Sequence, residues 1–181
     1  LQQARQDVAA AQQRLQSILD ASDEVAVIVM DISGVITLFN TGAERLLGYA
    51  ASEVLGSMEP ARFHDPVEVD VFLRAQPAEE RVGGLFAYMA RRARDQSWSR
   101  QWTFVRKDGQ RRQVSLSVSA VRDSDGLVNG FVSMAMDLTQ VLQARAEARL
   151  AEEKFAGAFT SAALGMALVS VDGRWLDVNE S

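Results

Sequence analysis

His64 is the one side chain in the sequence that could ligate a haem or another metal centre. The 181 residues hold a single histidine and no cysteine. This excludes disulfides, thiol catalysis, zinc fingers, iron–sulfur clusters and cysteinyl–flavin photochemistry. His64 precedes Asp65 and Pro66, which suit a helix N-cap and a first helical turn, so we expect it in a loop or at a helix start. A surface or loop histidine explains this position better than a metal ligand, and we expect no haem and no metal site.

No other constellation of residues indicates catalysis. The sequence has no Gly-x-Ser-x-Gly run, no phosphate-binding loop and no cluster at metal-ligand spacing. Asp31, Asp108 and Asp125 stand in glycine-containing turns, and turn chemistry explains them better than acid–base work. With 19 basic against 24 acidic residues the net charge is −5, which builds no basic face for phosphates. We therefore expect neither an enzyme nor a nucleic-acid partner.

The elements that must position these residues follow from the apolar patterns. Two apolar runs, 25–30 and 35–39, are joined by a glycine turn and predict a hairpin. A helical or irregular region follows, and alternating patterns then predict three more strands around 102–104, 114–120 and 128–136. Two strands, a group of helices and three strands predict an α+β fold with an antiparallel sheet, the helices lying between strands two and three.

The first residues carry a heptad pattern. Leu1, Val8 and Leu15 are seven residues apart, and Ile18 continues the same stripe. This spacing is typical of a short coiled coil, so we expect a helical linker over 1–19 whose stripe forms a dimer seam. An amphipathic helix packed on its own domain would show the same pattern.

The end of the sequence repeats its beginning at an offset of 139 residues. Gly173 and Asn179 correspond in this way to Gly34 and Asn40, within a run that is again strand, glycine turn, strand. A second heptad stripe precedes the repeat. We therefore predict one complete domain, a helical linker and the start of a second, truncated domain, at 20–139, 140–158 and 159–181.

In the order and spacing of its motifs the sequence resembles a Per-Arnt-Sim (PAS) sensor domain. The segment Phe63 to Glu68 further resembles a PAS subgroup of bacterial multidomain signalling proteins that end in histidine kinases or in diguanylate cyclase and phosphodiesterase domains. The motifs that carry the resemblance are Met30 to Phe39 with Asn40, Leu46 to Tyr49, Ser52 to Gly56, Arg106 to Gly109, and Gly130-Phe131 leading to Asp137-Leu138-Thr139.

The resemblance implies a PAS fold with a ligand pocket between the inner face of the sheet and the middle helices. The same side chains could instead fill a dry core. The cofactor stays open between none, a small metabolite and, with less support, haem or flavin. The candidate pocket residues are Val27, Val29, Phe63, Phe72, Leu85, Met89, Trp102 and Phe104.

The resemblance also implies a sensory or signal-transmission module that acts on a downstream output domain. Asp137, Leu138 and Thr139 would then pass the signal from the sheet to the output helix. The alternative is a ligand-free dimerisation and spacer module. We expect a homodimer formed by the helical linkers and the PAS domain, with adjacent PAS and output domains in the same chain. The longest apolar run, 25–30, is too short to cross a bilayer. With the resemblance to bacterial signalling proteins we expect a cytoplasmic domain, whether or not its parent protein carries a membrane anchor.

If the N-terminal stripe is a dimer seam, introducing charge into it must weaken the dimer. We predict that sedimentation at micromolar concentration shows a dimer, and that Val8→Asp combined with Leu15→Asp weakens it. The pair Gln6→Asp and Gln13→Asp has the same spacing but lies off the stripe, and should leave the dimer intact. A monomeric wild type would contradict the prediction.

Overall fold

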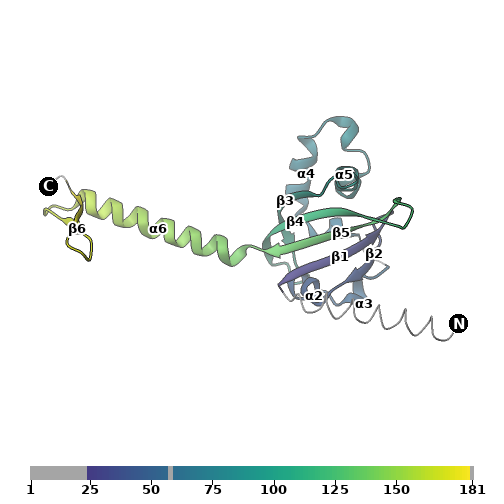
Figure 1. The fold of residues 1–181 in the computed structure, drawn as a ribbon, viewed down its shortest axis with the longest axis horizontal. Helices are drawn as coiled ribbons and strands as arrows, with labels where there is room; N and C mark the ends of the chain where they lie inside the picture. Colours follow the sequence, from purple (N-terminus) through teal and green to yellow (C-terminus); the bar gives the residue numbers. More distant parts are fainter. Residues whose placement is uncertain (1–23, 57–58, 180–181) are drawn as a thin grey trace. The chain divides into compact units, whose positions relative to one another are not determined.

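The computed structural model describes residues 24–56 and 59–179, and these fall into two units that divide after Thr139. The first unit is built on a five-stranded antiparallel sheet with the strand order β2-β1-β5-β4-β3 (Figure 1). The strands are β1 (Val25–Asp31), β2 (Ile36–Phe39), β3 (Trp98–Val105), β4 (Arg111–Arg122) and β5 (Val128–Asp137).

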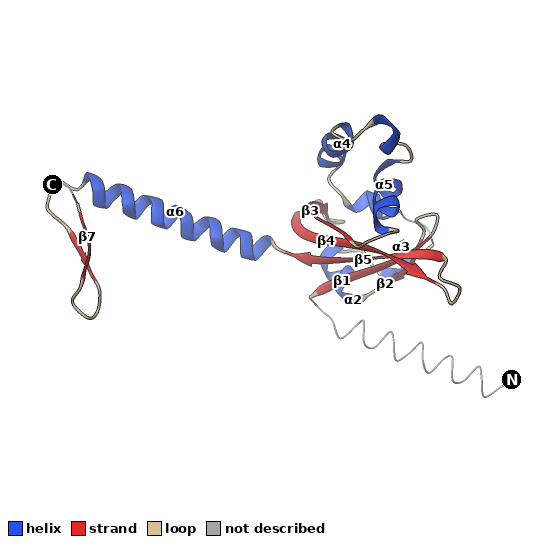
Figure 2. Ribbon diagram, turned by 45° about the horizontal axis from the view of Figure 1, so that its top comes forward, coloured by secondary structure: helices blue, strands red, loops and turns tan. Residues whose placement is uncertain are grey.

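All helices of this unit that the structure describes before β5 lie between β2 and β3 in the sequence. Figure 2 shows these helices in blue and the strands in red. Buried apolar side chains from these helices and from one face of the sheet form a single core. The predicted α+β class and antiparallel sheet are confirmed. The helical elements are α2 (Thr41–Leu47), α3 (Ala51–Val54), the 3₁₀ helix η1 (Pro60–Phe63), α4 (Pro66–Arg74), the 3₁₀ helix η2 (Ala78–Glu80) and α5 (Gly84–Ala93).

Strand β3 begins four residues earlier than the alternation at Trp102 and Phe104 indicates. Arg100 interrupts the apolar alternation that would otherwise have marked Trp98 as part of the strand. In the structure the Arg100 guanidinium lies 4.4 Å from the ring centroid of Phe72 and 4.7 Å from that of Trp102. The Arg100 cation therefore lies over aromatic faces on the side of β3 that also carries Trp98 and Trp102, while the residue itself is exposed.

Asn40 connects the first hairpin to the first helix. Its side-chain oxygen accepts hydrogen bonds from the backbone N–H of Val27 at 2.8 Å and of Ala43 at 2.9 Å. Its side-chain amide donates to the carbonyl of Val25 at 3.1 Å. The residue is fully buried, and it acts both as the N-cap of α2 and as a bridge to β1.

The second unit consists of α6 (Thr139–Ser161) and a hairpin of β6 (Ala167–Val169) and β7 (Trp175–Val178). This hairpin reproduces the β1–β2 hairpin at the offset of 139, including its register and the position of its bulge. The Asn179 side chain accepts from the Met166 N–H at 2.6 Å and donates to the Leu164 carbonyl at 3.0 Å. These are the counterparts of the Asn40 contacts with β1.

Of the two predicted helical linkers, the structure describes only the second. Residues 1–19, with Leu1, Val8, Leu15 and Ile18, lie outside the described residues. The second linker falls within α6, where Val141 and Phe155 of the apolar stripe are each about half exposed. The coiled-coil seam and the second domain stay predictions. None of the helices in the described part of the chain is both long and apolar enough to cross a membrane.

The Asn40 contacts predict a large and local effect on stability. Asn40→Ala removes a helix cap and leaves the buried Val27 N–H unpaired, and should lower the free energy of unfolding of the first unit by about 3 kcal/mol. The matched variant Asn179→Ala removes the corresponding strand contacts from the second hairpin and should leave that transition unchanged. Urea unfolding followed by circular dichroism measures both, and equal effects of the two variants would contradict the prediction.

Candidate functional site

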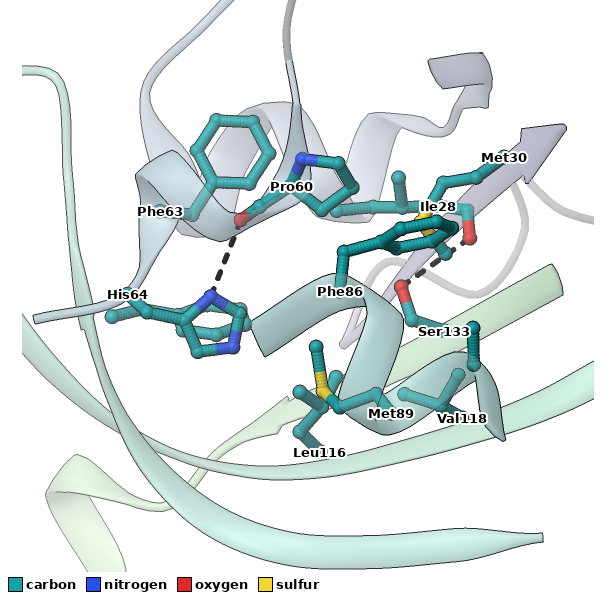
Figure 3. Close-up of a pocket in the computed structure, with 12 residues that line it drawn as sticks. Ile28, Met30, Pro60, Phe63, His64, Phe86, Met89, Leu116, Val118 and Ser133 are labelled. Carbon is teal, nitrogen blue, oxygen red and sulfur yellow. Dashed lines mark hydrogen bonds between the residues drawn. The ribbon is translucent and has the colours of Figure 1, made fainter. Parts of the chain in front are cut away.

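A small cavity lies between the inner face of the sheet and the elements η1 and α5 (Figure 3). Its volume is about 20 Å³, which is enough for about one water molecule. The side chains around it are apolar except for those of His64 and Ser133. The lining residues are Ile28, Met30, Pro60, Phe63, His64, Phe86, Met89, Ala90, Phe104, Leu116, Val118 and Ser133.

Of the eight pocket candidates taken from the sequence, the structure brings Phe63, Met89 and Phe104 to this cavity. Three more are buried in the same core without lining it, and two lie on the other face of β1. The three in the core are Phe72, Leu85 and Trp102, and the two on the other face are Val27 and Val29.

The prediction chose the wrong face of β1 for a simple physical reason. Successive side chains of a strand point to opposite faces, and Ile28 and Met30 are the ones that line the cavity. Because every residue from Val25 to Met30 is apolar, the sequence pattern does not show which face is the inner one. The hydrogen bond from the Val27 N–H to Asn40 is a contact that only the structure reveals.

His64 follows η1 and precedes α4, as expected, but its side chain is buried and only 4% exposed. Of the two expected alternatives, a surface or a loop histidine, the loop position agrees with the structure and the surface exposure does not. The ring lies edge-on between Trp102 and Phe104, with centroid distances of 5.2 and 4.8 Å. Asp65 caps α4 by accepting from the N–H groups of Val67 and Glu68, as the sequence suggested.

The His64 ring has one hydrogen-bond partner among the described residues. Its Nδ1 lies 3.2 Å from the carbonyl oxygen of Pro60, while its Nε2 is buried and unpaired within this part of the chain. Burial lowers the pKa of the imidazole from its usual 6.5 to about 4, against the smaller opposing effects of the Pro60 and Ala61 backbone groups. His64 is therefore neutral at physiological pH.

Neither haem nor flavin fits this cavity as it stands. A porphyrin or an isoalloxazine ring is many times larger than a space of about 20 Å³. The described residues also contain no group of three His, Asp or Glu side chains able to hold a metal ion. The wall of the cavity is apolar apart from the side chains of His64 and Ser133.

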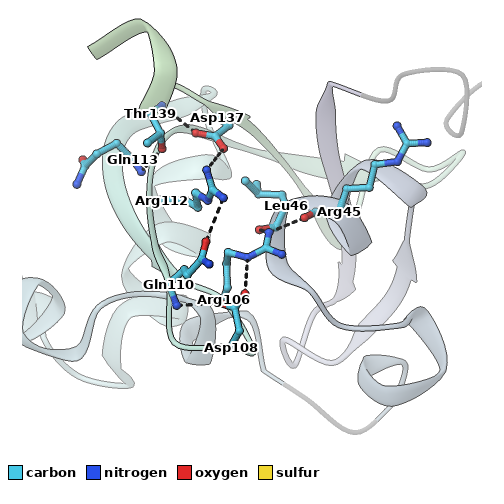
Figure 4. A network of polar contacts seen from close by, with 9 residues as sticks. All are labelled: Arg45, Leu46, Arg106, Asp108, Gln110, Arg112, Gln113, Asp137 and Thr139. Carbon is cyan, nitrogen blue, oxygen red and sulfur yellow. Dashed lines mark hydrogen bonds and ion pairs between the residues drawn. The ribbon is translucent and has the colours of Figure 1, made fainter. Parts of the chain in front are cut away.

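The junction at Asp137, Leu138 and Thr139 is tied to the neighbouring strand β4 (Figure 4). The Leu138 N–H donates to the Gln113 carbonyl at 2.7 Å, and the Gln113 N–H donates to Thr139 Oγ1 at 3.1 Å. Asp137 Oδ1 accepts from the Thr139 N–H at 2.8 Å, and Arg112 lies 3.8 Å from Asp137 Oδ2. These hydrogen bonds join the end of β5 and Thr139, the first residue of α6, to β4.

Arg112 and Gln113 were not predicted from the sequence, because a polar residue on an exposed strand position carries no signal of its partner. The same applies to Arg106, which the sequence placed only in a turn. Its guanidinium donates to the carbonyls of Arg45 and Leu46, both at 2.6 Å, and so pairs the end of α2 with the β3–β4 turn (Figure 4).

The buried neutral histidine predicts a pH dependence of stability. The unfolded chain takes up a proton on this ring near pH 6.5, whereas the folded protein does so only near pH 4. The contribution of the neutral His64 ring to the free energy of unfolding is therefore complete above pH 6.5. It is lost as the pH falls toward 4, by up to about 3 kcal/mol. Urea unfolding across this window should show the loss in the wild type and a smaller one in His64→Gln. Parallel profiles for the two proteins would contradict the assignment.

Residues 13–138 match the family model described as PAS fold. Similar solved structures include a PAS domain from Colwellia psychrerythraea, at 18% identity and a TM-score of 0.55, covering 72% of this chain and 98% of that one. A domain of a sensory box sensor histidine kinase/response regulator from Geobacter sulfurreducens has 16% identity and a TM-score of 0.53, covering 72% and 96%. An RNA-binding light-oxygen-voltage receptor has 23% identity and a TM-score of 0.55, covering 83% and 39%.

At these identities the structural likeness shows the fold alone, and no curated protein matches the chain. The family match, in contrast, spans well over half of the sequence. With the five-stranded sheet and the helices between β2 and β3, it shows that the chain belongs to the PAS-fold family of sensory and signalling domains.

Proposed function

We propose that the domain senses a small ligand, or receives a conformational signal, on the inner face of its sheet and transmits it through α6 to an output domain. The observation that carries this proposal is that the same two strands line the cavity and hold the junction. Leu116 and Val118 of β4 and Ser133 of β5 line the cavity. Gln113 of β4 binds the junction that ends β5.

The proposed path is short and continuous. A group that pushes on Val118 or Leu116 displaces β4, which is paired with β5 along most of the length of β5. Gln113 lies three residues from Leu116 on the same strand. Its carbonyl accepts from the Leu138 N–H, and its N–H donates to Thr139 Oγ1. A displacement of a fraction of an ångström would then alter the hydrogen bonds at the first turn of α6.

The output partner is part of the same proposal. The resemblance to PAS domains of bacterial signalling proteins supports a histidine kinase or a diguanylate cyclase or phosphodiesterase as the output, with the domain working as a homodimer in the cytoplasm. The apolar stripe of α6, with Val141 and Phe155 half exposed, supports a helical partner for this linker. The domain itself would carry no catalytic step.

A second candidate is a ligand-free dimerisation and spacer module. It is favoured by the small volume of the cavity, about 20 Å³, because a packed apolar core needs no ligand. Native mass spectrometry of the purified chain separates the two, since a sensor with a tightly held ligand would show a retained mass and a spacer would not.

The relay itself is tested by filling the cavity from β4. Val118→Ile adds one methylene group toward the cavity, whereas Ser117→Thr adds a methyl group on the opposite face of the same strand. We predict that Val118→Ile changes hydrogen exchange at the amides of Gln113, Leu138 and Thr139 by about threefold or more, and that Ser117→Thr does not. Unchanged exchange at these amides in both variants would favour the spacer.

A further inference from the structure

We propose that Nε2 of His64 is the hydrogen-bond acceptor for a small neutral ligand that carries a single hydroxyl or N–H donor on an apolar body. This inference rests on the proposed function and names the class of molecule that the cavity would take. It follows from the tautomer of His64, from its burial and from the lining of the cavity.

The tautomer is fixed by the partner of Nδ1. The carbonyl oxygen of Pro60, 3.2 Å away, can only accept a hydrogen bond, so Nδ1 must carry the proton. A neutral imidazole has one N–H, and Nε2 is then left with a lone pair. The backbone helps to fix this arrangement, because the His64 N–H donates to the Ala61 carbonyl and His64 forms a β-bridge with Phe104.

The lone pair is buried and has no partner among the described residues. Figure 3 shows Nε2 on the side of the ring away from Pro60, toward Met89 and Leu116, which line the cavity. A buried acceptor without a donor is unfavourable, so a molecule that supplies a donor here gains more than the same molecule without one.

The rest of the lining decides what else the ligand can carry. Apart from His64, the one polar side chain of the cavity is Ser133, whose hydroxyl donates to the Ile28 carbonyl at 3.3 Å. A charged ligand, or one with several polar groups, would leave them unpaired against methionine, leucine and phenylalanine side chains. A neutral molecule with one hydrogen-bond donor and an otherwise apolar structure leaves no polar group unpaired in this cavity.

The cavity must widen for anything larger than water. Met89, which lines it from α5, has an unbranched and flexible side chain that adapts readily to a neighbour. Truncating this residue opens the cavity permanently and leaves His64 and Pro60 in place. The variant Met89→Ala therefore allows the recognition chemistry to be tested apart from the cost of widening.

The first experiment reads the tautomer in the wild type. Because His64 is the only histidine, protein labelled with ¹⁵N-histidine gives one pair of imidazole nitrogen signals. We expect Nδ1 protonated and Nε2 bare at neutral pH. The opposite tautomer would overturn the proposal without reference to any ligand or variant.

The second experiment compares phenol with toluene, which have similar shapes and differ in the donor. In Met89→Ala we expect phenol to bind about tenfold more tightly than toluene, the difference that one buried hydrogen bond makes, and to shift the Nε2 signal. The preference should vanish in Met89→Ala combined with His64→Leu. Equal binding of phenol and toluene to Met89→Ala would overturn the proposal, as would a wild type that binds neither phenol nor the smaller methanol.

The same samples separate this inference from the proposed relay. If phenol binds through Nε2 while amide exchange at Leu138 and Thr139 stays unchanged, the ligand class stands and the relay fails. If toluene binds as tightly as phenol and those amides respond, the relay stands and the hydrogen bond to His64 is refuted.

Discussion

The first unit depends on the buried side chain of Asn40, which holds a strand and a helix at one point. Its single oxygen accepts from an N–H of β1 and from one in the first turn of α2. The far end of α2 is held by the Arg106 guanidinium, which belongs to the β3–β4 turn. One short helix therefore connects the strand at one side of the sheet to the hairpin at the other, and the core closes between them.

Much of the fold could be predicted because its signals are local. Glycine turns, alternating strands and the Asp65 cap each depend on a few adjacent residues, and they indicated the element order and the fold class. The start of β3 was missed because Arg100 breaks the apolar alternation, and its compensation by the rings of Phe72 and Trp102 comes from distant parts of the chain.

The candidate site was less predictable because its properties are set by tertiary contacts. Asp65 and Pro66 after His64 indicate a loop or a helix start, and the structure has His64 there. The rings of Trp102 and Phe104, however, pack edge-on against its side chain. The inner face of β1 could not be identified within a wholly apolar run. Gln113 joins the junction through its backbone, and no side-chain pattern can reveal such a contact.

Because the β1–β2 and β6–β7 hairpins are alike, one could take the place of the other during folding. Two segments with the same register could compete for the place beside β5, and strand exchange between similar modules is a known route to misfolding. Here the side chains differ in volume at matching positions, since Ala167 corresponds to Ile28 and Trp175 to Ile36. An exchanged hairpin would leave a void at one position and a clash at the other, so divergence between the repeats discourages each from replacing its counterpart.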